Sequence, residues 1–130
     1  MKGVVRWVIG EGIEGETDNG KITPFYSETA ASPMQIVLQA HGACSLIDVL
    51  AGLKHRMENI TAMWIELESE RASESPKVFT SVNMKYVIEG DVPEKLVRRL
   101  IHQSHEKYCS VGAMITRSGA KLDWSLDIRQ

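Results

Sequence analysis

The sequence predicts an α+β protein in which a mainly antiparallel sheet packs on a central buried helix. Apolar and polar residues alternate, as in half-buried strands, within residues 3–25, 60–90 and 121–130. Helical stretches near 33–57 and 93–118 lie between these groups, so strands and helices are segregated along the chain. With 130 residues the chain is long enough to form one domain, residues 1–130, around a core of its own.

Residues 3–25 are expected to form three short strands. Residues 4–9 are rich in β-branched side chains, which favour strands. The sequence Asp18-Asn19-Gly20 supplies the positive φ angles of a tight hairpin turn. A loop at 27–32 then leads to the first helix.

The first helix is expected to run from residue 33 to about residue 57. Ser32 can cap it, and Pro33 suits the first helical position, where its missing N–H is not needed. Apolar residues point in nearly every direction, so we expect the helix to be buried on most sides. Gly52 would allow another element to approach closely. The few polar positions are Gln35, Gln39, His41, Ser45 and Asp48.

Residues 60–70 and 77–90 are expected to pair as a long hairpin, because both segments alternate and an exposed turn separates them. Asp91 and Pro93 mark the start of a second helix, and a short third helix follows near Cys109. The last segment, 121–130, alternates again. Its predicted buried face consists of Leu122, Trp124, Leu126 and Ile128.

Composition and charge exclude some classes of function. Apolar residues make up 43% and charged residues 25% of the chain, which is ordinary for a globular domain, and the net charge of −2 argues against nucleic acid as a partner. The N-terminus lacks the features of a signal peptide, and no apolar stretch is expected to span a bilayer. We therefore expect a cytoplasmic protein without a membrane partner, whose two cysteines are either inert or functional.

The two cysteines, Cys44 and Cys109, each lie in an apolar helical segment. Free cysteine is often a small packing residue, and on spacing alone inert packing is the stronger interpretation. The alternative is redox chemistry. A hydrogen-bonding or cationic neighbour would then lower the pKa of a thiol and favour the thiolate that attacks peroxide.

The same helices offer two other possible sites, a metal site and a hydrolytic triad. His102, His105 and Cys109 would share a helix face, with Cys44 as a fourth metal ligand, but their spacing matches no structural zinc motif. Ser45, His41 and Asp48 would also share a face, as in a hydrolytic triad. The chain has no GxSxG motif, however, so a polar stripe that satisfies itself inside a buried helix is the better interpretation.

Three segments together resemble the OsmC/Ohr family of osmotically induced and organic hydroperoxide resistance proteins. They are SPMQIVLQAHGACSLIDVL, VFTSVNMKYVIEGD and SHEKYCSVGAMI. The most specific features are Ser32-Pro33 ahead of Cys44 and the EKYC sequence that ends in Cys109. The resemblance covers nearly the whole chain and is strongest to the short OsmC-like branch.

The resemblance implies an intertwined homodimer and a thiol peroxidase that needs no metal, flavin or haem cofactor. A hydroperoxide substrate would oxidise Cys44 to a sulfenic acid, and Cys109 would condense with it to a disulfide. A dithiol reductant, of the lipoyl type in the best-known members, would then restore both thiols.

The chain departs from the family pattern beside the reactive cysteine. Active members have a glutamate after the proline that opens the helix, and it orients an arginine; here Met34 and Gln35 follow Pro33. Gln35 and His41 are therefore only possible supporting residues, and the arginine role is not assigned to Arg6. The alternative function is a non-catalytic dimeric domain that binds a small apolar or thiol-reactive ligand.

Overall fold

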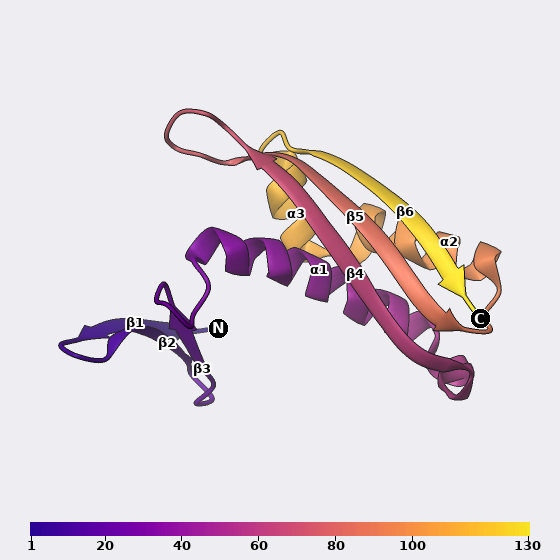
Figure 1. Ribbon diagram of the computed structural model, residues 1–130, viewed down its shortest axis with the longest axis horizontal. Coiled ribbons are helices and arrows are strands. Elements are labelled where there is room, and N and C mark those ends of the chain that lie inside the picture. Colours follow the sequence, from indigo (N-terminus) through magenta and orange to yellow (C-terminus); the bar gives the residue numbers. More distant parts are fainter. The chain divides into compact units, whose positions relative to one another are not determined.

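A computed structural model describes residues 1–130 (Figure 1). The chain divides into two compact units, residues 1–37 and 38–130. The first unit contains strands β1 (Gly3–Val8), β2 (Gly12–Thr17) and β3 (Ile22–Phe25), which form an antiparallel sheet in the order β1-β2-β3. The three predicted N-terminal strands are therefore confirmed, whereas the prediction of one domain stays a prediction.

Turn chemistry holds this first sheet in register. Gly10 and Gly12 adopt positive φ between β1 and β2, and Gly20 does so between β2 and β3. Within the Asp18-Asn19-Gly20 turn only Gly20 has a positive φ. The Thr17 hydroxyl closes the loop by accepting a hydrogen bond from the Lys21 amide (2.9 Å).

The sheet of the first unit has little core of its own. Its pocket of about 420 Å³ is lined by Val5, Ile13, Phe25, Tyr26 and Pro33. Trp7 is 68% exposed and Ile9 is 81% exposed. A three-stranded sheet with this much exposed apolar surface needs another layer to cover it.

Helix α1 (Pro33–Gly52) starts with a reciprocal capping box. The Ser32 hydroxyl accepts a hydrogen bond from the Gln35 amide (3.3 Å), and the Gln35 side-chain oxygen accepts one from the Ser32 amide (2.9 Å). The predicted start is therefore confirmed. The predicted end near residue 57 is wrong for the α-helix, which stops at Gly52 and is followed by the 3₁₀ helix η1 (Lys54–Asn59).

Burial along α1 is confined to one stripe rather than to most sides of the helix. His41, Gly42, Ser45 and Val49 are buried, whereas Ile47 is 66% exposed. By length and hydropathy alone α1 could cross a membrane, but a core helix of a soluble protein passes the same test. Here the Ser45 and Asp48 side chains of the helix are hydrogen-bonded within the second unit.

The second sheet contains β4 (Ile60–Arg71), β5 (Phe79–Gly90) and β6 (Lys121–Arg129) in the order β4-β5-β6. The long antiparallel β4–β5 hairpin confirms the prediction. Strand β6 pairs with β5 in parallel, because the chain returns through the helices between them before it starts the last strand. The protein is α+β, as predicted, and its sheets are mainly antiparallel.

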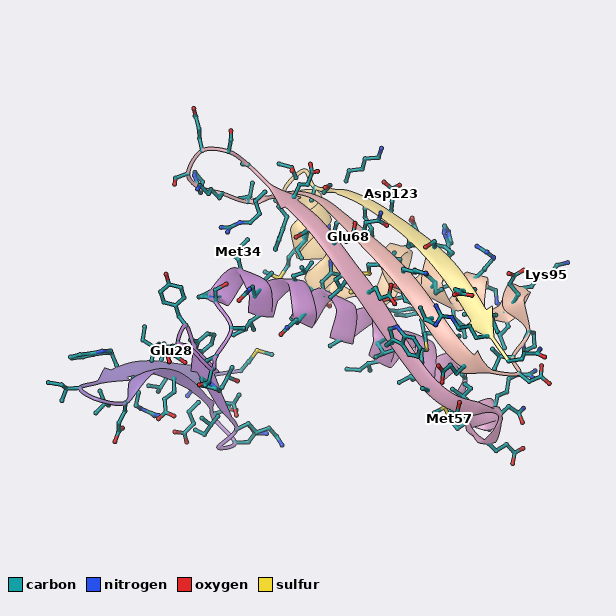
Figure 2. All side chains as sticks on the ribbon, viewed as in Figure 1. Glu28, Met34, Met57, Glu68, Lys95 and Asp123 are labelled. Atoms are coloured by element: carbon teal, nitrogen blue, oxygen red, sulfur yellow. The ribbon has the colours of Figure 1, made fainter.

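One face of the second sheet is covered by helices, and the other is exposed (Figure 1). Glu68 of β4 and Asp123 of β6, labelled in Figure 2, are both exposed and lie opposite the same residue of β5, Asn83. The residues that face the helices are the core of the unit. From β5 these are Val82, Met84, Tyr86 and Ile88.

The covering helices after β5 are α2 (Glu94–Gln103), the π-helical turn η2 (Ser104–Tyr108) and α3 (Ser110–Arg117). Val97 and Ile101 of α2 are fully buried, and the Arg98 guanidinium lies 5.9 Å from the centre of the Trp124 ring. This arrangement puts η2 and the start of α3 beside the buried stripe of α1.

Candidate active site

Cys109 lies between two helices rather than inside one. Its backbone is extended (φ −75°, ψ 93°), because η2 ends at Tyr108 and α3 begins at Ser110. The Cys109 sulfur caps α3 by accepting a hydrogen bond from the Gly112 amide at 3.3 Å. The short third helix predicted near Cys109 is therefore confirmed, whereas the helix face shared by His102, His105 and Cys109 is wrong, because the sulfur is held by the start of α3.

The fold brings the two cysteine thiols together, although they are 65 positions apart in the sequence. Burial, opposed by the Gly112 amide and supported by the thiol of Cys44 as a hydrogen-bond partner, raises the pKa of Cys109. Cys109 is 3% exposed, whereas Cys44 on α1 is half-buried, and both are free thiols.

His41 is fully buried one helical turn before Cys44, and neither of its ring nitrogens has a hydrogen-bond partner. Its backbone carbonyl accepts a weak hydrogen bond from the Cys109 thiol (3.9 Å). A Cβ at Gly112 would lie 2.7 Å from His41 Nε2 and 3.1 Å from Cys109 Sγ. The imidazole and the sulfur therefore both lie against Gly112, at a position that only glycine leaves open.

A buried chain of hydrogen bonds connects α1, β5 and η2 behind this site. The Ser45 hydroxyl lies 2.5 Å from the Tyr86 hydroxyl, which lies 2.8 Å from His105 Nε2. The Ser104 hydroxyl lies 2.9 Å from that of Ser45 and donates to the Asp48 carboxylate at 2.8 Å. These bonds fix the stripe of α1 against the sheet and against η2.

The buried imidazoles are neutral at pH 7. Burial lowers the pKa of His41. Burial, followed by the neighbouring His41 and His102, lowers the pKa of His105 from 6.5 to about 4. The two rings meet edge to face with 6.1 Å between their centres. The site therefore holds uncharged nitrogen bases and not an imidazolium cation.

The geometry argues against the two alternative sites, the metal site and the hydrolytic triad. No group of three or more His, Cys, Asp or Glu side chains is placed to hold a metal ion, so His102, His105, Cys109 and Cys44 do not form a ligand set. Ser45 is hydrogen-bonded to Tyr86 and Ser104 rather than to His41, so it is not arranged as the nucleophile of a triad.

Comparison with known proteins gives the family. A family model described as OsmC-like protein matches residues 26–125. The chain is 35% identical to Protein YhfA of Escherichia coli (strain K12) over 122 residues, which cover 91% of each chain. The chain belongs to the OsmC family.

Solved structures of other proteins share the fold of this chain. A crystal structure of a hypothetical protein from Aquifex aeolicus VF5 is similar with a TM-score of 0.82 and 28% identity, covering 99% of this chain and 97% of that one. An organic hydroperoxide resistance protein OsmC from Legionella pneumophila is similar with a TM-score of 0.64 and 15% identity, covering 100% and 98%. The second likeness concerns the fold alone.

Gln35 and Arg6, the side chains nearest in type to the family's glutamate and arginine, both belong to the first unit. The side chain of Gln35, a possible supporting residue, is occupied by the capping box at the start of α1. Arg6 of β1 forms ion pairs with Glu14 (3.1 Å) and Glu16 (3.0 Å) of β2, and these two carboxylates raise the pKa of its guanidinium. Within their unit, both side chains therefore have local structural partners.

Sequence reasoning missed several residues that build the site. Neither Tyr86 nor Ser104 is among the candidate site residues predicted from the sequence. Their signal was polar atoms at positions where the strand and helix periods require burial, since such atoms need hydrogen-bond partners. Gly112 gave no such signal, because its role is to leave room for His41 and Cys109.

Proposed function

We propose that this OsmC-family protein is a thiol peroxidase that reduces organic hydroperoxides through Cys44 and Cys109. The observation that carries the proposal is the position of the Cys109 thiol, 3.9 Å from the His41 carbonyl oxygen and so beside the turn of α1 that carries Cys44. The family includes hydroperoxide resistance proteins, as the name of the Legionella pneumophila structure states, and this supports the substrate class.

The exposure of the two thiols assigns their roles. Cys44 is half-buried and can be reached by a substrate, so it is the peroxidatic cysteine. Cys109 is almost fully buried and its raised pKa keeps it protonated at pH 7, so it reacts poorly with peroxide from solution. It is the resolving cysteine, which acts once an oxidised sulfur is beside it.

The proposed peroxidase cycle requires only thiol chemistry. The Cys44 thiolate attacks the terminal oxygen of the hydroperoxide, the O–O bond breaks, and the alkoxide leaves as an alcohol after taking a proton. Cys109 sulfur then attacks the Cys44 sulfenic acid, forming the S–S bond as the S–O bond breaks and water leaves. A dithiol reductant, for which the lipoyl type is the family expectation, reduces the disulfide in two exchange steps.

We also propose that the protein forms a homodimer. The first-unit sheet leaves Trp7 and Ile9 exposed, and α1 leaves Ile47 exposed, in a chain whose family is typically dimeric. Covering these surfaces with a second copy would bury apolar area that a single chain leaves in water. In such an intertwined dimer residues 1–130 would act as one domain. We expect it in the cytoplasm, where a reducing environment keeps both cysteines as thiols between cycles.

The alternative function, non-catalytic binding of a small apolar or thiol-reactive ligand, is favoured by two features. The imidazoles beside the cysteines are neutral, and Met34 and Gln35 supply no carboxylate after Pro33, with the Gln35 amide engaged in capping. Thiolate formation at Cys44 would then lack the charged support that active members use.

The test is hydroperoxide consumption with the full-length, reduced protein. Cumene hydroperoxide and dihydrolipoamide are supplied, and turnover is compared among the wild type, Cys44→Ser and Cys109→Ser. We expect Cys44→Ser to abolish turnover and Cys109→Ser to permit a single oxidation of Cys44, trapped as a sulfenic acid. Turnover that persists in Cys44→Ser contradicts the proposal. A wild type that binds cumene hydroperoxide without consuming it supports the binding function.

A further inference from the structure

The least explained group in the protein is the imidazole of His41. A buried polar atom without a partner costs about 1–3 kcal/mol, so native proteins retain few of them, and both ring nitrogens of His41 are in this state. An apolar side chain of similar size would fill the same space without that cost. The identity of this residue therefore calls for a chemical explanation.

The surroundings of His41 point to the thiol of Cys109. One carbon atom at Gly112 would contact both His41 Nε2 and Cys109 Sγ, at 2.7 and 3.1 Å, so only glycine lets both groups lie against this backbone position. The sulfur is also held there by a hydrogen bond from the Gly112 amide. Catalytic hydrogen bonds are often long in resting enzymes and tighten when the reacting groups are in place.

We propose that His41 is the general base of the resolving step: its Nε2 accepts the thiol proton of Cys109 as the Cys109 sulfur attacks the Cys44 sulfenic acid. The S–S bond forms while the S–O bond of the sulfenic acid breaks. The imidazolium then gives the proton to the departing hydroxide, which leaves as water, so that His41 returns to its neutral form. The proposal rests on the peroxidase function proposed above.

The state of the groups around His41 suits this role. Because burial lowers the pKa of His41, the ring is unprotonated at pH 7 and its lone pair is available. Because burial raises the pKa of Cys109, the thiol keeps its proton until a base removes it. The remaining titratable neighbours are His105 from η2, Cys44 on α1, Tyr86 and Asp48. Tyr86 is hydrogen-bonded to His105, and Asp48 connects to Tyr86 through Ser104 and Ser45.

The experiment separates the two chemical steps in one turnover. The reduced full-length protein is mixed with one equivalent of cumene hydroperoxide, and sulfenic acid and disulfide are quantified over time by trapping and mass spectrometry. In His41→Gln we expect sulfenic acid to form at nearly the wild-type rate and the disulfide to form about 100-fold more slowly. His102→Gln, which removes an exposed histidine from α2, should match the wild type in both steps.

A second variant and a pH profile guard against a purely structural effect. Gly112→Ala places a methyl group between the imidazole and the sulfur and should also slow only disulfide formation. In the wild type this step should be independent of pH from 8 down to about 6.5, because His41 is already neutral there. In His41→Gln the rate should rise with pH as solvent hydroxide ionises the buried Cys109 thiol.

Two outcomes overturn the inference, and they differ. If sulfenic acid forms but His41→Gln and Gly112→Ala make the disulfide as fast as the wild type, with the same pH profile, His41 is not the base and the peroxidase function stands. If the wild type forms neither sulfenic acid nor disulfide, the proposed function fails and the base role fails with it.

Discussion

The hydroxyl of Ser45 on α1 lies 2.5 Å from the hydroxyl of Tyr86 on β5, inside the core of the second unit. Both residues are fully buried, and Tyr86 also reaches His105 Nε2 at 2.8 Å. Burial raises the pKa of the Tyr86 phenol, which therefore remains a protonated hydrogen-bonding group. This hydrogen bond connects α1, the helix that carries Cys44, to β5, the central strand of the second sheet.

Tyr86→Phe should therefore destabilise the protein. The substitution keeps the ring but leaves Ser45 and His105 without their buried partner, which should cost about 1–3 kcal/mol in the free energy of unfolding. Urea denaturation monitored by circular dichroism measures it. Tyr108→Phe removes the same atom from a residue that is 63% exposed, and it should change stability by less than about 0.5 kcal/mol. Equal effects of the two substitutions would contradict this account.

The two thiols should react at different rates with an alkylating agent. Cys44 is half-buried, whereas Cys109 is 3% exposed and burial raises its pKa. Limited iodoacetamide treatment of the native protein at pH 7, followed by peptide mass spectrometry, should label Cys44 at least about tenfold faster, because only the thiolate reacts. Denaturation in urea supplies the control, since it should make the two labelling rates nearly equal. Faster labelling of Cys109 in the native state would reverse the roles assigned to the two cysteines.

Gly52→Ala tests the contact at the end of α1. On helix propensity alone this change should stabilise the protein by up to about 1 kcal/mol. However, a Cβ at Gly52 would lie within 3.0 Å of three side-chain atoms of Leu100 on α2. We expect a net loss of about 1–2 kcal/mol from this overpacking.

The matched control for Gly52→Ala is its combination with Leu100→Ala. If the clash with Leu100 causes the loss, the double variant should be more stable than the two separate losses predict. Thermal and urea denaturation of the four proteins measure this coupling. Stabilisation by Gly52→Ala in the wild-type background would show that Leu100 moves aside without cost.

Much of this fold was predictable because its local patterns agree with its burial. The alternation in β4 and β5 predicted the hairpin, and Ser32 with Pro33 predicted the start of α1. The pairing direction of β6 was not evident, since alternation is the same for parallel and antiparallel neighbours and the direction depends on the helices before it. Exposure of Ile47 was also missed, because an apolar helix face can be covered by another copy as well as by its own chain.

The site was predictable in its cysteines but not in its supporting groups. Cys44 and Cys109 stood out as two thiols in apolar segments, and a new helix near Cys109 was predicted, whereas the π-helical turn η2 before it left no clear mark in the sequence. That turn moves Cys109 from a helical position into the cap of α3 and directs its sulfur toward Gly112. Spacing rules assume a continuous helix, and for this reason they wrongly grouped Cys109 with His102 and His105.

Ile47→Asp tests the proposed homodimer. Ile47 is 66% exposed on α1, so an aspartate there should not disturb the core of a single chain. If a second copy covers this face, burying an unpaired carboxylate should weaken association at least tenfold. Sedimentation velocity over a range of concentrations measures this change. Val78→Asp, at a half-exposed apolar position outside the helices and strands, is the control and should leave the dimer intact.

The buried histidines should make the protein sensitive to mild acid. The pKa of His105 is lowered from 6.5 to about 4, mainly by burial, and that of His41 is lowered as well. The unfolded chain therefore binds more protons than the folded protein below pH 6.5, and stability falls as the pH drops through 6.5 and on toward 4. For His105 alone we expect a loss of about 2 kcal/mol between pH 7 and pH 5. Urea denaturation at several pH values measures it.

His105→Gln should flatten this pH dependence, whatever its effect on stability at pH 7, because the titrating group is gone. His55→Gln is the matched control: it removes an exposed histidine from η1, which is not among the groups that shift His105, and should leave the slope between pH 7 and pH 5 unchanged. The window ends at pH 5 because carboxylates of ordinary pKa begin to take up protons below it. An unchanged slope in His105→Gln would mean that His105 is solvated in the folded protein and that the hydrogen-bonded chain from Asp48 does not close around it.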